Sequence, residues 1–176
     1  MAREMRVVPY DPRWPEQFDA IRAELADLFG PLAMEIHHIG STAVPGLQAK
    51  PIIDVLIVVD RIEAVDALDG RMRAAGYSPR GESDIPGRRY FVMLAADGEN
   101  HARHIHCYEP DNPHIADELL FRDTLRTDGE AFRQYERVKL ESAEKFRFSP
   151  ANYEAYKAGC VASILNKARK NTSRTS

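Results

Sequence analysis

One stretch of the chain, residues 38–59, constrains the fold more than any other. It ends in the run Ile52-Ile-Asp-Val-Leu-Ile-Val-Val59, whose short length and β-branched residues are typical of a strand buried on both faces. Asp54 then lies near the start of an apolar strand, where an unpaired carboxylate is costly. Upstream, Gly40-Ser41-Thr42 offers a flexible turn with two hydroxyls and several backbone N–H groups, the material of an anion-binding nest. A phosphate-holding turn and an acid on the next strand favour metal-assisted phosphoryl or nucleotidyl transfer.

The same stretch resembles the signature of the GrpB family, which is grouped with the nucleotidyltransferase superfamily. The resemblance rests on His38-Ile-Gly-Ser-Thr-Ala-Val-Pro-Gly-Leu47 and Lys50-Pro-Ile-Ile-Asp54, with further agreement over residues 8–15, 86–91, 104–106 and 121–123. Similar domains are found fused to dephospho-CoA kinase. The resemblance implies a minimal nucleotidyltransferase-like fold of the α+β class, a mixed β-sheet packed with helices and completed by C-terminal helices. We expect a single domain over residues 1–170 and a disordered tail over residues 171–176.

Hydrophobic periodicity assigns the individual elements. Apolar residues at helical spacing predict helices over residues 14–29, 61–75, 117–125 and 129–146, and a last helix that starts at Ser149-Pro150. Shorter apolar or alternating runs predict strands over residues 33–39, 52–59, 77–83, 89–96 and 102–109. Asp97-Gly98 is a strong turn signal between the last two strands. Asp60 is the expected cap of the second helix.

Composition limits the classes of partner. The chain has 176 residues and a formal net charge of -3, so it has no global attraction to nucleic acid or to an anionic membrane. A phosphate ligand must therefore be held by a local basic cluster. Cys107 and Cys160 are too few for a disulfide framework, and the sequence has neither a signal peptide nor a membrane-spanning apolar run. We expect a cytoplasmic protein that binds neither bulk nucleic acid nor membrane.

The residue two positions after Asp54 differs from the superfamily pattern. Superfamily members with transfer activity usually carry a second acid two residues after the first, where both side chains share a face and hold divalent metal. Here that position is Leu56. A single carboxylate makes a weaker magnesium site, because hard cations need several oxygen ligands. Glu82 or Asp84 can supply the missing acid if their loop folds back. Alternatively, Asp54 caps the Gly-Ser turn as a structural acid.

Two histidines on a later strand are candidate partners of Asp54. His104 and His106 are two residues apart, so their rings point to the same face of a strand. Together with Asp54 they make a plausible site for a divalent metal. Imidazole favours zinc, manganese or iron over magnesium, whereas the nucleotidyltransferase resemblance favours magnesium or manganese. His38, directly before the turn, can join the metal ligands, and its neighbour His37 should face the opposite side.

Cations near a bound phosphate are expected from several parts of the chain, because Lys supplies a point charge and Arg a bidentate fork. The candidates are Lys50, Arg88, Arg89, Lys139 and Lys157. If Arg88 and Arg89 lie on a strand, only one of them can face the site.

Three functions follow from these residues. The leading hypothesis is metal-dependent transfer of a nucleotide from a nucleoside triphosphate to an unknown acceptor, with Gly40, Ser41 and Thr42 around the β- and γ-phosphates. Asp54 would position the metal, while His104 and His106 would complete the set of metal ligands or orient the acceptor. The second is a catalytically inactive module that binds a nucleotide or phosphometabolite, which Leu56 favours. The third is a metal-dependent hydrolase built on the histidines and Asp54. One scaffold hosts many functions, so the fold does not choose among them.

Overall fold

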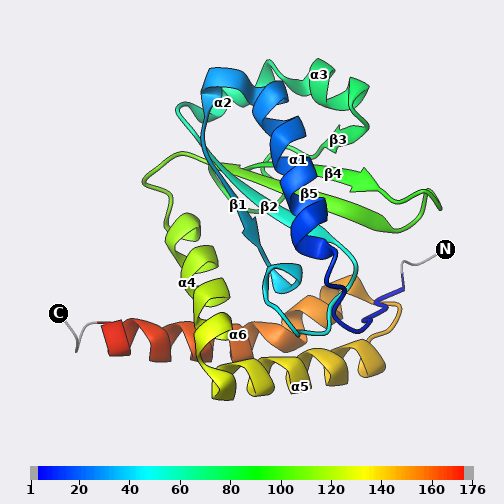
Figure 1. Cartoon of the computed structure of the whole chain (residues 1–176), viewed down its shortest axis with the longest axis vertical. Helices are drawn as coiled ribbons and strands as arrows, with labels where there is room; N and C mark the ends of the chain where they lie inside the picture. Colours follow the sequence, from blue (N-terminus) through cyan, green and yellow to red (C-terminus); the bar gives the residue numbers. More distant parts are fainter. Residues whose placement is uncertain (1–3, 173–176) are drawn as a thin grey trace.

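A computed structural model describes residues 4–172 as one five-stranded sheet packed with helices, which confirms the predicted α+β class (Figure 1). The strands are β1 (Ala33–Ile39), β2 (Ile53–Val59), β3 (Tyr77–Pro79), β4 (Arg89–Leu94) and β5 (His101–Tyr108). The α-helices are α1 (Trp14–Phe29), α2 (Ile62–Asp66), α3 (Asp69–Ala74), α4 (Pro113–Thr127), α5 (Gly129–Lys145) and α6 (Pro150–Thr172). Two 3₁₀ turns, η1 (Gly30–Leu32) and η2 (Ser41–Ala43), precede and follow β1.

The strand order is β1-β2-β5-β4-β3, and the sheet is mixed. β2 pairs with β1 in the antiparallel sense and with β5 in the parallel sense, while β4 pairs antiparallel with both β3 and β5. The parallel register sets Asp54 beside His104 and Leu56 beside His106. Because alternate residues of a strand share a face, Asp54, His104 and His106 all point to the same side of the sheet.

The opposite side of the sheet carries the main hydrophobic core. Val55, Ile57 and Val59 of β2 are fully buried there, together with Ile105 and Cys107 of β5. Helix α1 covers this face through its apolar stripe, of which Leu25 is fully buried. β2 is therefore buried on both faces, as its largely apolar, β-branched sequence predicts.

The helices after β5 surround the Asp54 side of the sheet. Helix α4 packs through Ile115 and Leu119 against Leu56 and Tyr108. A further cluster joins α4, α5 and α6 to the loop after η2, where Leu47 is fully buried. Figure 1 shows α5 and α6 side by side across the end of the sheet where η2 lies. A cleft lies between the sheet, α4, α5 and α6.

The helix predicted over residues 61–75 is interrupted. It forms two short helices, α2 and α3, because the N–H of Leu68 bonds to the carbonyl of Val65, three residues back, and tightens the chain between them. Asp60 does not cap it. Instead the N–H of Ile62 donates to Oε1 of Glu109 over 2.8 Å, so a tertiary contact replaces the expected local one.

The ends of the remaining elements differ by small shifts. The helix expected over residues 117–125 extends to Pro113–Thr127, where the side chain of Asn112 accepts from the N–H of His114 and caps its start. Helix α6 continues through Thr172, two residues into the predicted tail. The rest of that tail lies outside the described residues. None of the helices within residues 4–172 has the length and apolar character needed to cross a membrane.

Candidate functional site

The Gly-Ser turn is built directly against the Asp54 carboxylate. Gly40 has φ +69°, a conformation that favours glycine. A methyl group added at its α-carbon would lie 2.6 Å from Oδ2 of Asp54 and 3.1 Å from the Asp54 β-carbon. Glycine at this position therefore allows the turn to approach the acid.

Side chains from three elements fix the turn. The Thr42 hydroxyl donates to the carbonyl of Ile52 over 3.1 Å and lies 3.0 Å from Nε2 of His38. From α4, Arg122 Nη1 donates to the carbonyl of His38 over 3.0 Å. Arg126 donates twice to the carbonyl of Ala43, over 2.9 and 2.7 Å. These bonds occupy carbonyl groups on both sides of the turn and hold it at the sheet edge.

Asp54, His104 and His106 form a compact cluster. Nδ1 of His104 lies 2.9 Å from Oδ1 of Asp54, and Nε2 of His106 lies 4.0 Å from the same oxygen. One nitrogen of each ring and one carboxylate oxygen lie within 4.8 Å of one another. Two imidazoles and a carboxylate suit manganese, zinc or iron. The donor set therefore fits a divalent cation of that kind.

His101 extends the cluster. Its Nδ1 lies 2.7 Å from Nε2 of His104, so both ring nitrogens of His104 are engaged. Ligating histidines are commonly oriented by a partner on their second nitrogen. His101 occupies that place, although the sequence predicts that this strand begins one residue later, at residue 102. It is instead the first residue of β5.

Charge within the cluster favours ionised Asp54. Burial tends to raise the pKa of Asp54, but the hydrogen bonds and charges of His104 and His106 outweigh burial and hold that pKa below its usual range. The bonds of Asp54 recorded within residues 4–172 run to the histidines rather than to the turn. The expectation of a structural cap on the turn is thus wrong, and the turn is fixed by other groups.

A cleft of about 770 Å³ opens beside this cluster. Its lining includes the turn residues Gly40, Ser41 and Thr42, the cluster residues Asp54, His104 and His106, and the cations Lys50, Arg88, Lys139 and Lys157. Its apolar walls come from α4 and α6, among them Phe121, Val161 and Leu165. The predicted turn, acid, histidines and most of the predicted cations therefore meet in one space.

Three lysines line the cleft. Lys50 and Lys157 share the carboxylate of Glu154, at 3.2 and 2.9 Å. Lys139 is 1% exposed, and its Nζ has no hydrogen-bond partner among the described residues. Burial, with the charges of Lys157 and Lys50, lowers the pKa of Lys139 well below its usual value. An uncompensated buried amine is costly unless a ligand pairs with it.

Two predicted site residues point elsewhere. His38 pairs with Val55 in the sheet, so it lies on the α1 side, stacked on Phe18, and does not join the metal cluster. The assignment of His38 and His37 to the two faces was therefore reversed. Arg89 also turns away, because it binds Asp66 through two nitrogens at 2.6 and 2.9 Å. Arg88, the residue just before β4, is the member of the pair that faces the cleft.

Two further residues that line the cleft were not predicted from the sequence. Glu118 of α4 lines the cleft, and burial raises its pKa, with the negative charge of Asp54 adding to the effect and the positive charge of His106 opposing it. Tyr90 of β4 also lines the cleft, and the centroid of its ring lies 5.5 Å from that of His104 and 5.0 Å from that of His106. Glu82 does not replace the missing acid, because its carboxylate accepts from the N–H of Gly87. Glu118 carries no local motif, so only the packing of α4 could reveal it.

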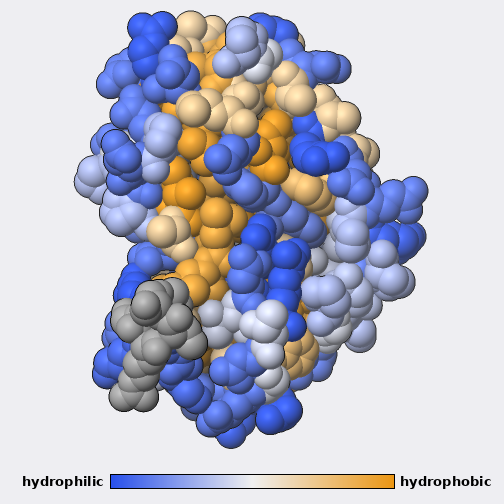
Figure 2. All heavy atoms as spheres, turned by 60° about the vertical axis from the view of Figure 1, so that its left-hand side comes forward, coloured by the Kyte–Doolittle hydropathy of each residue, from blue (hydrophilic) through white to orange (hydrophobic). Residues whose placement is uncertain are grey.

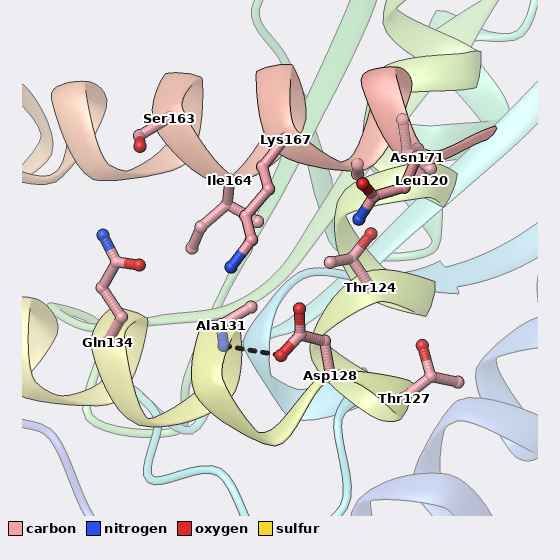
Figure 3. Close-up of a pocket in the computed structure, with 11 residues that line it drawn as sticks. Leu120, Thr124, Thr127, Asp128, Ala131, Gln134, Ser163, Ile164, Lys167 and Asn171 are labelled. Atoms are coloured by element: carbon pink, nitrogen blue, oxygen red, sulfur yellow. Dashed lines mark hydrogen bonds between the residues drawn. The ribbon is translucent and has the colours of Figure 1, made fainter. Parts of the chain in front are cut away.

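A smaller pocket of about 200 Å³ lies between α4, α5 and α6. Figure 3 shows its walls, in which Thr124 of α4 faces Lys167 of α6 and Asp128 caps α5 through the N–H of Ala131.

Apolar and hydrophilic residues are unevenly distributed over the outer surface of the protein. On the side that carries α4, apolar residues gather in the middle and hydrophilic ones surround them (Figure 2).

Relatives with similar sequences are bacterial. UPF0157 protein YqkA of Bacillus subtilis is 45% identical and matches 80% of this chain, although the match spans only 40% of its own length. UPF0157 protein SCO7215 of Streptomyces coelicolor is 34% identical over 95% of this chain and 86% of its own. A dephospho-CoA kinase of Mycolicibacterium paratuberculosis is 34% identical and is matched over 40% of its length. In YqkA and this kinase, the chain therefore corresponds to less than half of the relative.

Two solved structures have folds similar to that of this chain. The Cid1 poly(U) polymerase with bound Mg and 3'-dATP matches 85% of this chain and 49% of its own at 13% identity, with a TM-score of 0.56, which shows a shared nucleotidyltransferase-like fold. The conserved protein GrpB of Enterococcus faecalis matches 92% of this chain and 98% of its own at 34% identity, with a TM-score of 0.83. The GrpB protein family model matches residues 4–167. The chain therefore belongs to the GrpB family.

Proposed function

We propose that this protein transfers a nucleotide from a nucleoside triphosphate to an acceptor hydroxyl with the help of a divalent cation. The observation that carries the proposal is the position of Lys139. Its buried amine has no hydrogen-bond partner among the described residues and lines the same cleft as Asp54 and the two histidines. A cleft lined both by a buried amine without a hydrogen-bond partner and by a cation-binding donor set suits a metal-bound polyphosphate, whose negative charge favours the protonated amine.

Each part of the cleft has a role in this proposal. The backbone N–H groups of Gly40, Ser41 and Thr42 and the hydroxyl of Ser41 bind the β- and γ-phosphates, while the Thr42 hydroxyl holds the turn through its bond to Ile52. Lys50, Lys139 and Lys157, which line the same cleft, neutralise the phosphates. The apolar wall of α6 excludes water from the reacting groups.

Asp54, His104 and His106 would hold the cation, through the atoms that already converge. A bound cation supplies neutralisation of phosphate charge as the acceptor hydroxyl attacks the α-phosphorus and pyrophosphate leaves. His101 orients His104 for this role through its 2.7 Å contact. The imidazole-rich donor set favours manganese or zinc over magnesium.

One observation favours a second candidate, a catalytically inactive module that binds nucleotide or phosphometabolite. Leu56, at the position where a second acid would stand, is fully buried against Ile39, Val58 and Tyr108. It packs in the core and leaves no oxygen ligand there. The proposed transfer therefore depends on a single strand carboxylate and the two histidines.

A thermal-shift screen separates these functions, because a ligand selective for the folded state raises its melting temperature. Metal-stripped protein is measured with each nucleoside triphosphate, alone and with magnesium, manganese or zinc. A nucleotide shift that needs metal supports transfer, and radiolabelled pyrophosphate release then measures it. A metal-independent nucleotide shift supports the inactive module, and a shift with metal alone supports the His/Asp hydrolase.

The variant Asp54→Asn tests the same point within the cleft. It should abolish both the metal-dependent shift and pyrophosphate release, because an amide oxygen is a poor substitute for the carboxylate. Asp66→Asn is the control, since Asp66 pairs with Arg89 away from the cleft. Transfer that survives Asp54→Asn would reject the proposal.

A further inference from the structure

Two polar atoms in the walls of the cleft are buried without a hydrogen-bond partner. They are Nζ of Lys139 on α5 and Oη of Tyr153 on α6, and both residues line the cleft. No other side-chain polar atom in the described part of the chain is both buried and unpaired. Because burial without a hydrogen bond is costly for an amine and for a hydroxyl alike, their presence in one cleft points to a shared ligand.

The packing of α6 on α5 brings Tyr153 to the face of α5 that carries Lys139. Ser142 follows Lys139 by three residues, so these two side chains share one face of α5. The fully buried hydroxyl of Ser142 donates to the backbone carbonyl of Tyr153 over 2.9 Å. The start of α6 is therefore fixed to this face, and both unpaired atoms belong to the junction of the two helices.

Two further lysines lie over the ring of Tyr153. Nζ of Lys50 is 4.5 Å from the ring centroid, and Nζ of Lys157 is 4.3 Å from it. An ammonium group at such a distance is attracted by the negative face of the ring. The carboxylate of Glu154 pairs with both ammonium groups. Since one carboxylate serves two lysines, an excess of positive charge remains beside Tyr153.

The chemistry of these groups defines the ligand. A lysine ammonium has donors and no acceptor, and a phenolic hydroxyl has one donor. Burial raises the pKa of Tyr153, so its hydroxyl keeps the proton that it can donate. A water molecule would pair with the hydroxyl but would leave the excess positive charge unbalanced. A phosphate group supplies both the acceptor oxygens and the negative charge.

We propose that the hydroxyl of Tyr153 and the amine of Lys139 form one subsite for a phosphate group, which is occupied without the help of a metal ion. The subsite rests on the proposed function for its natural occupant, a phosphate of the polyphosphate chain of a nucleotide. No metal is needed, because the lysines themselves supply the positive charge. Tyr153 thereby becomes a binding residue, and its ring and its hydroxyl serve different parts of the subsite.

Calorimetric titration of the metal-stripped protein with pyrophosphate measures this subsite. The unmodified protein should bind pyrophosphate without metal. Tyr153→Phe should weaken this binding by roughly 10- to 100-fold, the effect of one hydrogen bond to a charged group. The variant keeps the ring on which Lys50 and Lys157 lie, so it removes the hydroxyl alone. Orthophosphate should bind less tightly than pyrophosphate, because it has no second phosphate for these lysines.

Urea denaturation without ligand distinguishes a binding hydroxyl from a structural one. Tyr153→Phe should be at least as stable as the unmodified protein, since it deletes a buried polar group that has no partner. A hydroxyl with a structural role would give the opposite sign. Tyr156→Phe is the matched control, because the Tyr156 hydroxyl on the same helix bonds to Lys145 and Glu141. Its affinity for pyrophosphate should equal that of the unmodified protein.

Three results would overturn the subsite: a loss of stability in Tyr153→Phe, an unchanged affinity of this variant for pyrophosphate, or pyrophosphate binding that requires a metal. Orthophosphate that binds as tightly as pyrophosphate would contradict the assignment to a polyphosphate.

The subsite and the transfer reaction fail separately. Metal-free pyrophosphate binding that depends on Tyr153, in a protein that releases no pyrophosphate from any nucleoside triphosphate, would support the subsite and reject the transfer. Pyrophosphate release by a protein whose pyrophosphate affinity is unchanged in Tyr153→Phe would support the transfer and reject the subsite.

Discussion

The α-carbon of Gly40 lies so close to the Asp54 carboxylate that a methyl group there would meet Oδ2 at 2.6 Å. Gly40→Ala should therefore displace the acid as well as strain the turn. Gly98→Ala is the control for a positive φ, because Gly98 has φ +71° and nothing within 4 Å of an added methyl group. Gly40 also has a ψ of −169°, a combination that essentially only glycine adopts, so backbone strain there costs on the order of 1–3 kcal/mol.

Urea denaturation and manganese titration of both variants separate strain from contact. Gly40→Ala should lose more stability than Gly98→Ala and should also lose manganese binding. Equal destabilisation of the two variants, with manganese binding intact, would show that the turn can move away from Asp54 without consequence.

Replacement of His101 should weaken the cation site without touching a ligand. His101→Ala removes the group that contacts Nε2 of His104 over 2.7 Å, so manganese affinity should fall by roughly 10- to 100-fold. His114→Ala is the control, since His114 stacks on Tyr108 and belongs to no part of the cluster. An unchanged dissociation constant in His101→Ala would exclude this orienting role.

Acid should destabilise the protein through His38. Burial is the main cause that lowers the pKa of His38 from 6.5 to about 4, so the unfolded chain binds its proton at a higher pH than the folded protein does. Stability is then fully present above the unfolded pKa and is lost as pH falls from about 6.5 towards 4. This loss amounts to about 2 kcal/mol between pH 7 and pH 5.

Urea denaturation across that range, compared with His38→Gln, isolates the contribution. The glutamine cannot titrate, so its stability should change less between the two pH values. A parallel decline in both proteins would assign the acid sensitivity to other groups.

Lys139→Met should stabilise the ligand-free protein. A thioether of similar length fills the space without the cost of a buried amine, and the gain should be about 1–3 kcal/mol. The same variant should lose the thermal shift produced by pyrophosphate, which measures the function that the lysine serves. Lys145→Met on the same helix is the control, because Lys145 contacts the exposed Tyr156 hydroxyl. Loss of stability in Lys139→Met would contradict the predicted cost of this buried lysine.

Local sequence patterns were sufficient for the strands that frame the site. The apolar run of β2 and the two-residue spacing of His104 and His106 predicted which side chains share a face, and the sheet confirms it. These features depend on strand alternation, a local property. The prediction that His38 joins the metal ligands was wrong, because it was based on the position of His38 directly before the turn in the sequence. Its pairing with Val55 determines the face on which it lies.

The features that local sequence did not predict depend on tertiary packing. Glu118 reaches the cleft from α4 and stands in no motif, and although Lys139 was among the expected cations, its burial without a hydrogen-bond partner depends on the packing of α5. The break between α2 and α3 and the Glu109 cap on Ile62 likewise depend on contacts that a window of sequence does not contain. Arg88 and Arg89 lie between these cases, since alternation predicts that one of them faces the cleft but does not say which.

The parallel pairing of β2 with β5 has a consequence for the order of folding. Asp54 and His104 are partners across fifty positions of sequence, so the loop between them must close before either can meet the other. Loop closure costs entropy and slows the formation of such contacts relative to the β4–β5 hairpin. The cation site should therefore appear late in refolding, and manganese binding in a stopped-flow experiment would report the completed sheet.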